Sequence, residues 1–370
     1  MQIFTPRGRL NRTLQAIEKG KLTIGFAGGS ITDARPEWNW PEPVIAWFGE
    51  QFPQVRILVE NDAIGATGSD LAAFRAQRSF IEPDCDLVFV EFAVNDLEQP
   101  STRRMRSREG LIRKLMQGEG RDVVLVYTFS QPMYAAMIQA EMPASISEFE
   151  QIADHYQISS VWMGLNALQE VMRGQMRWEE WLPDGLHPQA RGSLSYAQSV
   201  IAFLEEELSG SSNPQQILAG SHLPQPLECD NWENGFNLPF DLVKLEGPWV
   251  LRNWPKLAYI DHVLSTSAVG AKMSFTFEGR GLILGFDFGR SSSEFRYCLD
   301  GGEWQLSQRD RPDWCPPDGW YRLFPVSEDL SPGKHSFELE VIHGNSDPAS
   351  LLSAQYTGTN FRLALIGILP

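Results

Sequence analysis

Between about residues 20 and 208, the chain alternates short, nearly continuous apolar runs with longer segments of helical periodicity. The apolar runs are 22–27, 55–60, 86–94, 122–129 and 159–164. Helical patterns fall near 41–51, 70–80, 103–118, 146–157, 165–173 and 189–208. A strand that is apolar along its whole length is buried on both faces, as in a parallel sheet covered by helices. The pattern therefore predicts a three-layer α/β domain.

The sequence pattern changes after about residue 235, where short strand candidates are separated by turns that contain Gly, Pro and Asp. The strand candidates are 271–279, 281–288, 294–300, 334–342 and 361–368. The Asp-Gly-Gly sequence at 300–302 is typical of a hairpin connection. This half predicts an all-β sandwich that is antiparallel and jelly-roll-like.

Small polar residues at 209–216 separate the two halves and are typical of a linker. A chain of 370 residues is long enough for two domains. We therefore expect a first domain at 1–208, a linker at 209–234 and an accessory β-sandwich domain at 235–370.

The composition limits the classes of partner. With 42% hydrophobic and 21% charged residues, the chain is typical of a globular protein with packed cores. The net charge of −16 argues against nucleic acid or an anionic membrane surface as the main partner, because both require clustered Lys and Arg. The segment 1–15 has no apolar run of signal-peptide length, and no stretch is long enough to span a membrane, so we expect a cytoplasmic protein.

The four cysteines are scattered without CxxC spacing, and the six histidines show no metal-binding pattern. We interpret the cysteines as free thiols in a reducing compartment. Neither a metal nor an organic cofactor is expected.

Polar motifs follow the first three strands and precede the last helix. They are 28-GGSIT-32, 61-NDAIGATGSD-70, 93-AVND-96 and 184-DGLHP-188. Each alone is also explained by a turn or a helix cap. In an open α/β sheet, however, ligands bind at the carboxyl ends of the strands, beside the point where the strand order reverses. A strand order of 2-1-3-4-5 would make Ser30 and Asn95 neighbours.

The last motif places an aspartate three residues before a histidine. Across a short turn, Asp184 can accept a hydrogen bond from Nδ1 of His187 and so fix the tautomer of the ring. Nε2 of His187 is then free to take a proton from Ser30. These three residues are the candidate catalytic residues.

Taken together, the four motifs resemble the SGNH (GDSL-like) hydrolase family over roughly the first 208 residues. Ser30 matches the nucleophile of the first block, although Gly29 replaces the usual Asp. Asp184 and His187 match the last block fully. The resemblance implies a flavodoxin-like three-layer domain with a parallel sheet.

The middle blocks match with changes. A gap-free match from the Asn at 61 puts Ala66 at the position of a Gly whose N–H joins the oxyanion hole, with Gly65 before it. Alanine fits poorly there if the turn needs a positive φ. In the third block Ala93 stands for Gly, while Asn95 and Asp96 match.

The resemblance implies a serine esterase that acts in two steps without a cofactor. Ser30 would attack the ester carbonyl, His187 would act as base, and Asp184 would orient His187. The oxyanion would be met by the N–H of Ser30, an N–H at Gly65 or Ala66, and the side-chain amide of Asn95. The GxSxG motif of α/β-hydrolases is absent, because Thr32 takes its last position.

Several residues near the motifs have more than one interpretation. Four tryptophans near the motifs, Trp38, Trp40, Trp178 and Trp181, could stack on sugar rings or line an acyl pocket, but packing of long loops explains them equally well. Trp38, Trp40 and Trp181 are the candidate substrate-binding residues. Glu91 lies inside an apolar strand and is interpreted either as a paired structural carboxylate or as the end of that strand. The Arg-rich stretch 103–108 is interpreted as a solvated helix face.

The leading functional hypothesis is a carbohydrate esterase that removes acetyl groups from a small-molecule or oligosaccharide substrate. A lipid, small-ester or thioester hydrolase is the alternative within the same class. Outside that class, the chain could be a non-catalytic glycan-binding protein or an acyltransferase. The β-domain is expected to shape the rim of the site or to serve packing, and the chain could form a homo-oligomer.

Overall fold

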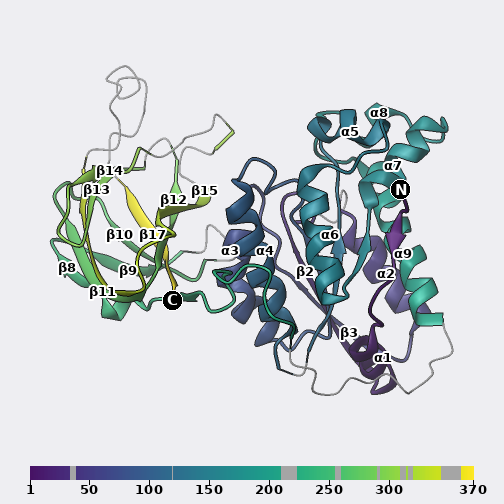
Figure 1. Ribbon diagram of the computed structural model, residues 1–370, viewed down its shortest axis with the longest axis horizontal. Coiled ribbons are helices and arrows are strands. Elements are labelled where there is room, and N and C mark those ends of the chain that lie inside the picture. Colours follow the sequence, from purple (N-terminus) through teal and green to yellow (C-terminus); the bar gives the residue numbers. More distant parts are fainter. Residues whose placement is uncertain are drawn as a thin grey trace. The chain divides into compact units, whose positions relative to one another are not determined.

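The computed structural model describes residues 1–33, 39–118, 120–209, 223–254, 260–289, 292–308, 314–315, 320–342 and 360–370. It divides into two compact units, Met1–Glu233 and Asn234–Pro370 (Figure 1). Among the described residues, no helix is long and apolar enough to cross a membrane.

The first unit contains a six-stranded sheet. In spatial order its strands are β3 (Arg56–Asn61), β2 (Lys21–Gly28), β4 (Leu87–Glu91), β5 (Asp122–Val126), β6 (Ser159–Val161) and β1 (Phe4–Thr5). The first five are parallel to their neighbours in the predicted order 2-1-3-4-5, which confirms the flavodoxin-like arrangement. Strand β1 adds an antiparallel edge that was not predicted, because two residues carry no periodic signal.

Helices lie on both faces of this sheet (Figure 1). They are α1 (Asn11–Glu18), α2 (Pro41–Gln51), α3 (Ser69–Ala76), α4 (Ser101–Met116), α5 (Tyr134–Ile138), α6 (Ala144–Tyr156), α7 (Met163–Met172), α8 (Trp178–Trp181) and α9 (Ala190–Ser209). Helix α4 packs against α3 and α6, whereas α9 packs against α2, α7 and α8. The three layers are therefore confirmed. The short helices α5 and α8 escape prediction because they span fewer than two turns.

The core explains why the apolar runs are continuous. Every residue of β4 and all but the first of β2 are buried, since helices cover both faces of these central strands. The edge strand β3 is partly exposed, and its sequence accordingly contains Arg56 and Glu60. Burial thus follows position in the sheet.

The Arg-rich stretch of α4 is not a solvated face. Arg108 is fully buried, and its Nε lies 2.8 Å from a carboxylate oxygen of the equally buried Asp96. Its guanidinium also lies 3.9 Å from the centre of the Phe149 ring on α6. The interpretation was wrong because α6 covers this part of α4 and supplies it with partners, which include Glu148 beside Arg104.

Part of the predicted linker is packed on α4. The N–H groups of Leu227 and Glu228 donate to the Glu109 carboxylate at 2.6 and 2.7 Å. The N–H of Trp232 donates to a carbonyl of α4, and its indole ring is buried. A Cβ on Gly110 would lie 2.5 Å from the backbone of Trp232, so only glycine allows this approach. Residues 223–233 therefore belong to the first unit.

The second unit is built from two antiparallel sheets, which confirms the predicted sandwich. One sheet contains β15 (Trp320–Ser327), β12 (Gly281–Phe288), β17 (Phe361–Leu369), β10 (His262–Thr266), β9 (Val250–Asn253) and β7 (Phe236–Asn237). The other contains β14 (Gln305–Leu306), β13 (Phe295–Leu299), β16 (Gly333–Val341), β11 (Lys272–Gly279) and β8 (Lys244–Glu246). Alternate residues of these strands form one aromatic-rich core.

The hairpin expected at 300–302 is present. It joins β13 to β14, and both Asp300 and Gly301 have positive φ, of 53° and 68°. Such values match the right-handed twist of the flanking strands, which explains the Asp-Gly sequence.

Replacing Arg108 with Met is expected to destabilise the first unit by about 3–5 kcal/mol, because Asp96 would remain buried without its charged partner. Urea unfolding followed by tryptophan fluorescence measures this loss. The control is Arg177→Met, since Arg177 pairs with Glu180 at the surface, where an ion pair contributes little. Equal unfolding midpoints for the two variants would contradict the importance of the buried pair.

Candidate active site

Three side chains from distant parts of the sequence form a hydrogen-bonded chain. Oγ of Ser30, just after β2, lies 2.8 Å from Nε2 of His187. Nδ1 of His187 lies 2.7 Å from Oδ2 of Asp184. The structure therefore brings together the three residues that the sequence proposes as catalytic, in the expected pairing of ring nitrogens.

The loop that carries Asp184 and His187 is fixed by its own hydrogen bonds. Oδ1 of Asp184 accepts the backbone N–H groups of Leu186 and His187 at 2.9 and 2.7 Å. Gly185, with φ of 79°, allows this turn, and its carbonyl accepts the N–H of Gln131 after β5. Burial favours a raised pKa for Asp184, but the hydrogen bonds from the backbone and ring of His187 hold that pKa below its ordinary value. Asp184 is thus held as a carboxylate.

Asn95 lies beside the turn that carries Ser30, as predicted. A Cβ on Gly29 would overlap the side-chain amide of Asn95, so the two residues are in direct contact. The Asn95 side chain is partly exposed, and among the described residues it has no hydrogen-bond partner. In this structure a side chain at position 29 would displace the amide of Asn95.

The loop after β3 has the strained geometry that its sequence suggests. Ala66 adopts a left-handed conformation with φ of 58°, at a cost of about 1–2 kcal/mol for a residue with a Cβ. The N–H of Ile64 donates to the carbonyl of Gly28 at 3.0 Å, which ties the loop to the end of β2. Gly65 and Ala66 therefore lie at the same edge of the sheet as Ser30.

Asp96, the neighbour of Asn95, has a structural role. Its carboxylate accepts the N–H of Ser69 at the start of α3 and pairs with Arg108 of α4. It is fully buried. Asp96 thus joins two helices beneath the site.

Of the four tryptophans near the motifs, two of the three candidate substrate-binding residues lie in the core, which corrects that interpretation. Trp40 and Trp181 are fully buried. The indole N–H of Trp40 donates to Oγ1 of Thr32 at 3.0 Å, and that of Trp181 donates to the hydroxyl of Tyr196 at 3.2 Å. A fully buried ring offers no face to a substrate. Trp38 lies outside the described residues.

Trp178, in contrast, is exposed and forms an aromatic pair with Tyr134. Trp178 and Tyr134 are 37% and 40% exposed, and their ring centres lie 5.7 Å apart. Trp178 also packs 4.9 Å from Trp181, which helps to fix its ring. Its position six residues before Asp184 was a sequence signal, whereas Tyr134 on the short helix α5 gave none.

Glu91 is the most unusual polar residue near the site. It is the last residue of β4, lies opposite Gly28 in the ladder with β2, and is fully buried. Burial raises its pKa to about 7, although hydrogen bonds from Thr128, Thr32 and Gly29 favour the charged form. Its place inside an apolar run was the only sequence signal.

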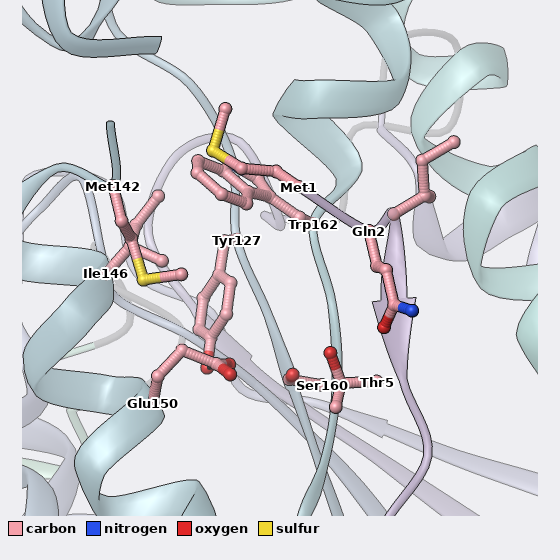
Figure 2. A pocket seen from close by; sticks show the side chains of 10 residues that line it. Met1, Gln2, Thr5, Tyr127, Met142, Ile146, Glu150, Ser160 and Trp162 are labelled. Atoms are coloured by element: carbon pink, nitrogen blue, oxygen red, sulfur yellow. Dashed lines mark hydrogen bonds between the residues drawn. The ribbon is translucent and has the colours of Figure 1, made fainter. Parts of the chain in front are cut away.

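A small cavity lies elsewhere in the first unit (Figure 2). It has a volume of about 120 Å³. Figure 2 shows Tyr127, Met142 and Ile146 on one side of it and Gln2 and Thr5 on the other. No residue of the candidate site lines it. Within the described ranges, no cluster of three or more His, Cys, Asp or Glu side chains could hold a metal ion.

Comparison with known proteins shows the fold. No family model and no curated protein matches the chain. A two-domain esterase (CEX) active on acetylated mannans matches with a TM-score of 0.81 and 22% identity, over 99% of this chain and 96% of that one. The same esterase co-crystallised with mannopentaose matches with a TM-score of 0.79, at the same identity and coverage. This chain therefore shares the two-domain fold of that esterase.

A third structure, of an acetyl xylan esterase variant (Axe2) from Geobacillus stearothermophilus, matches at 21% identity. The match covers 50% of this chain and 94% of that chain, with a TM-score of 0.40.

Replacing Gly29 with Ala is expected to displace the Asn95 amide and to cost about 1–3 kcal/mol, as in other overpacked sites. Thermal unfolding measures the cost, and a crystal structure shows the displaced amide. The control is Gly49→Ala on α2, where a Cβ meets nothing within 4 Å, so that this variant should gain up to about 1 kcal/mol. Unchanged stability of Gly29→Ala, with Asn95 in place, would contradict the contact.

Proposed function

We propose that this protein is a serine esterase that removes acetyl groups from oligosaccharides. Ser30 is the nucleophile, His187 the base and Asp184 the residue that orients the base. The observation that carries the proposal is the hydrogen-bonded chain of these three side chains at the carboxyl edge of the sheet. The fold, which matches that of an esterase active on acetylated mannans, supports it.

The first chemical step is the attack of Ser30 on the ester carbonyl. At 2.8 Å, Nε2 of His187 is within reach of the Ser30 proton. Asp184 accepts the Nδ1 hydrogen bond and stabilises the imidazolium that forms. His187 then passes the proton to the oxygen of the leaving sugar, and the acetyl group remains on Ser30.

Negative charge on the carbonyl oxygen requires donors that are already in place. The side-chain amide of Asn95, beside Gly29, supplies one. The N–H of Ser30 and an N–H at Gly65 or Ala66 supply the others. Loss of one such donor lowers the rate by about 100-fold or more in related chemistry.

The second step returns the enzyme to its starting state. Water attacks the acetyl group on Ser30 while His187 takes a proton from that water, and the same oxyanion donors act again. Acetate leaves, and Ser30 recovers its proton from His187. Each proton passes between Ser30, His187, the substrate and water, so the enzyme ends the cycle in its starting protonation state.

Three features favour an oligosaccharide acetyl ester as the substrate. The first is the fold match to an esterase co-crystallised with mannopentaose. The second is the exposed pair of Trp178 and Tyr134, because aromatic rings with one open face pack well against sugar rings. The net charge of −16 also suits a neutral glycan.

Replacing Ser30 with Ala is expected to lower kcat by at least about 10⁴-fold, as loss of a serine nucleophile does. Acetate release from acetylated manno-oligosaccharides and hydrolysis of p-nitrophenyl acetate measure the effect. Ser147→Ala on α6 is the control, because its hydroxyl bonds only within its own helix. A folded Ser30→Ala variant with wild-type turnover would show that the mechanism is wrong, and a wild type inactive on both substrates would overturn the acetyl esterase assignment.

A further inference from the structure

The carboxylate of Glu91 is surrounded by donors that belong to the nucleophile turn and to the next strand. One oxygen accepts the hydroxyl of Thr128, just after β5, at 2.7 Å. The other accepts the hydroxyl of Thr32, two residues after Ser30, at 3.1 Å. The backbone of Gly29, directly before Ser30, also favours the ionised form of this carboxylate. Glu91 thus connects the turn that carries Ser30 to Thr128, two residues after β5.

The turn contributes a further connection. Oγ1 of Thr32 accepts the indole N–H of Trp40 at 3.0 Å, so its own proton points to Glu91. Trp40, Thr32 and Thr128 are all fully buried, as is Glu91. A buried network of this kind is well ordered only when each donor has an acceptor.

Glu91 has no compensating cation. Within the described part of the chain, no ion pair with Lys, Arg or His is found for Glu91, and no cation is among the largest influences on its pKa. Asp96 acts on it as a like charge, and Tyr196 of α9 lies close enough for Glu91 to affect its titration. Burial of a carboxylate without a cationic partner lowers the stability of the fold. A role other than stabilising the fold would explain why a glutamate lies at this position.

We propose that Glu91 is a positioning residue for the nucleophile, and that its ionised carboxylate holds the turn at Gly29–Thr32 so that Ser30 faces His187. This inference rests on the proposed esterase function. Protonation of Glu91 would place an O–H donor against the hydroxyls of Thr32 and Thr128, which both donate to the carboxylate. One of these hydroxyls would then lose its charged acceptor or reverse its bond, and the contact that holds the turn would weaken.

The pKa of Glu91 places its change of protonation state near neutral pH. Burial raises that pKa to about 7, against the opposing hydrogen bonds. A carboxyl whose pKa is higher in the folded than in the unfolded chain stabilises the fold most at low pH, and that stabilisation is lost as pH rises through about 7. The form that orders the turn is therefore the less stable one, as is common at functional sites.

The test compares Glu91→Gln with wild type in the hydrolysis of p-nitrophenyl acetate. The glutamine keeps the shape but not the charge, so kcat should fall roughly 10–100-fold while KM changes little, as expected for a misplaced nucleophile. The control is Asp122→Asn, since Asp122 is another carboxylate with a pKa raised by burial, to about 6, and it accepts from Thr13 at the opposite edge of the sheet. That control should keep wild-type kcat.

The pH profile separates a positioning role from a merely structural one. In wild type, protonation of Glu91 should add about one unit to the limiting slope of log(kcat/KM) against pH at low pH. Glu91→Gln lacks this titrating group, so its limiting slope should be smaller by about one. Wild-type kcat and an unchanged slope in Glu91→Gln would overturn the inference.

A second pair of variants decides the matter if Glu91→Gln does not fold. Thr128→Val removes one donor to Glu91 and should lower kcat, whereas Thr128→Ser keeps the hydroxyl and should restore it. Equal, wild-type kcat in both would overturn the inference.

Labelling of Ser30 by a fluorophosphonate distinguishes the two proposals. If wild type is inactive and is not labelled at Ser30, the proposed function falls together with this inference. If wild type is labelled and Glu91→Gln is labelled at the same rate, this inference alone falls.

Discussion

The parallel register between β2 and β4 is the constraint on which the site depends. It sets Gly28 opposite Glu91, so that both strands end at the same level. The turn that carries Ser30 then emerges directly beside Asn95, and Gly29 touches the amide of Asn95. A slip of one residue would turn these side chains to the other face of the sheet. Because β2 and β4 are buried on both faces, burial alone does not set this register, and the geometry of the site depends on the pairing of the two strands.

The polar groups buried beneath this edge of the sheet have two different roles. The pair of Arg108 and Asp96 satisfies its charges internally and joins α4 to the start of α3. Glu91 lacks such a partner and is held only by neutral donors, which leaves its pKa at about 7. The first arrangement fixes the scaffold, whereas the second makes the nucleophile turn sensitive to pH under our proposal. Both contrast with the exposed loop of Asp184 and His187, which is ordered by its own backbone N–H groups.

The sequence predicts the central strands well because residues such as Ile24 and Val88 lie where both faces are covered, which leaves a continuous apolar run. It also predicts which polar residues meet, since they end neighbouring parallel strands. It could not reveal that Trp40 is buried, because the sequence pattern around a tryptophan does not distinguish a core residue from one that lines a pocket. The burial of Arg108 was equally hidden, since it depends on α6, which is distant in sequence. Tertiary contacts decide both cases.

The proposed mechanism requires that Ser30 becomes acetylated during turnover. Rapid acid quenching of the enzyme with p-nitrophenyl acetate, followed by peptide mass spectrometry, tests this step. The mechanism predicts one acetyl group on the peptide that contains Ser30, formed within the first turnover and absent in Ser30→Ala. Ester hydrolysis without such an adduct in the pre-steady state, or with the acetyl group on another residue that is required for turnover, would contradict it.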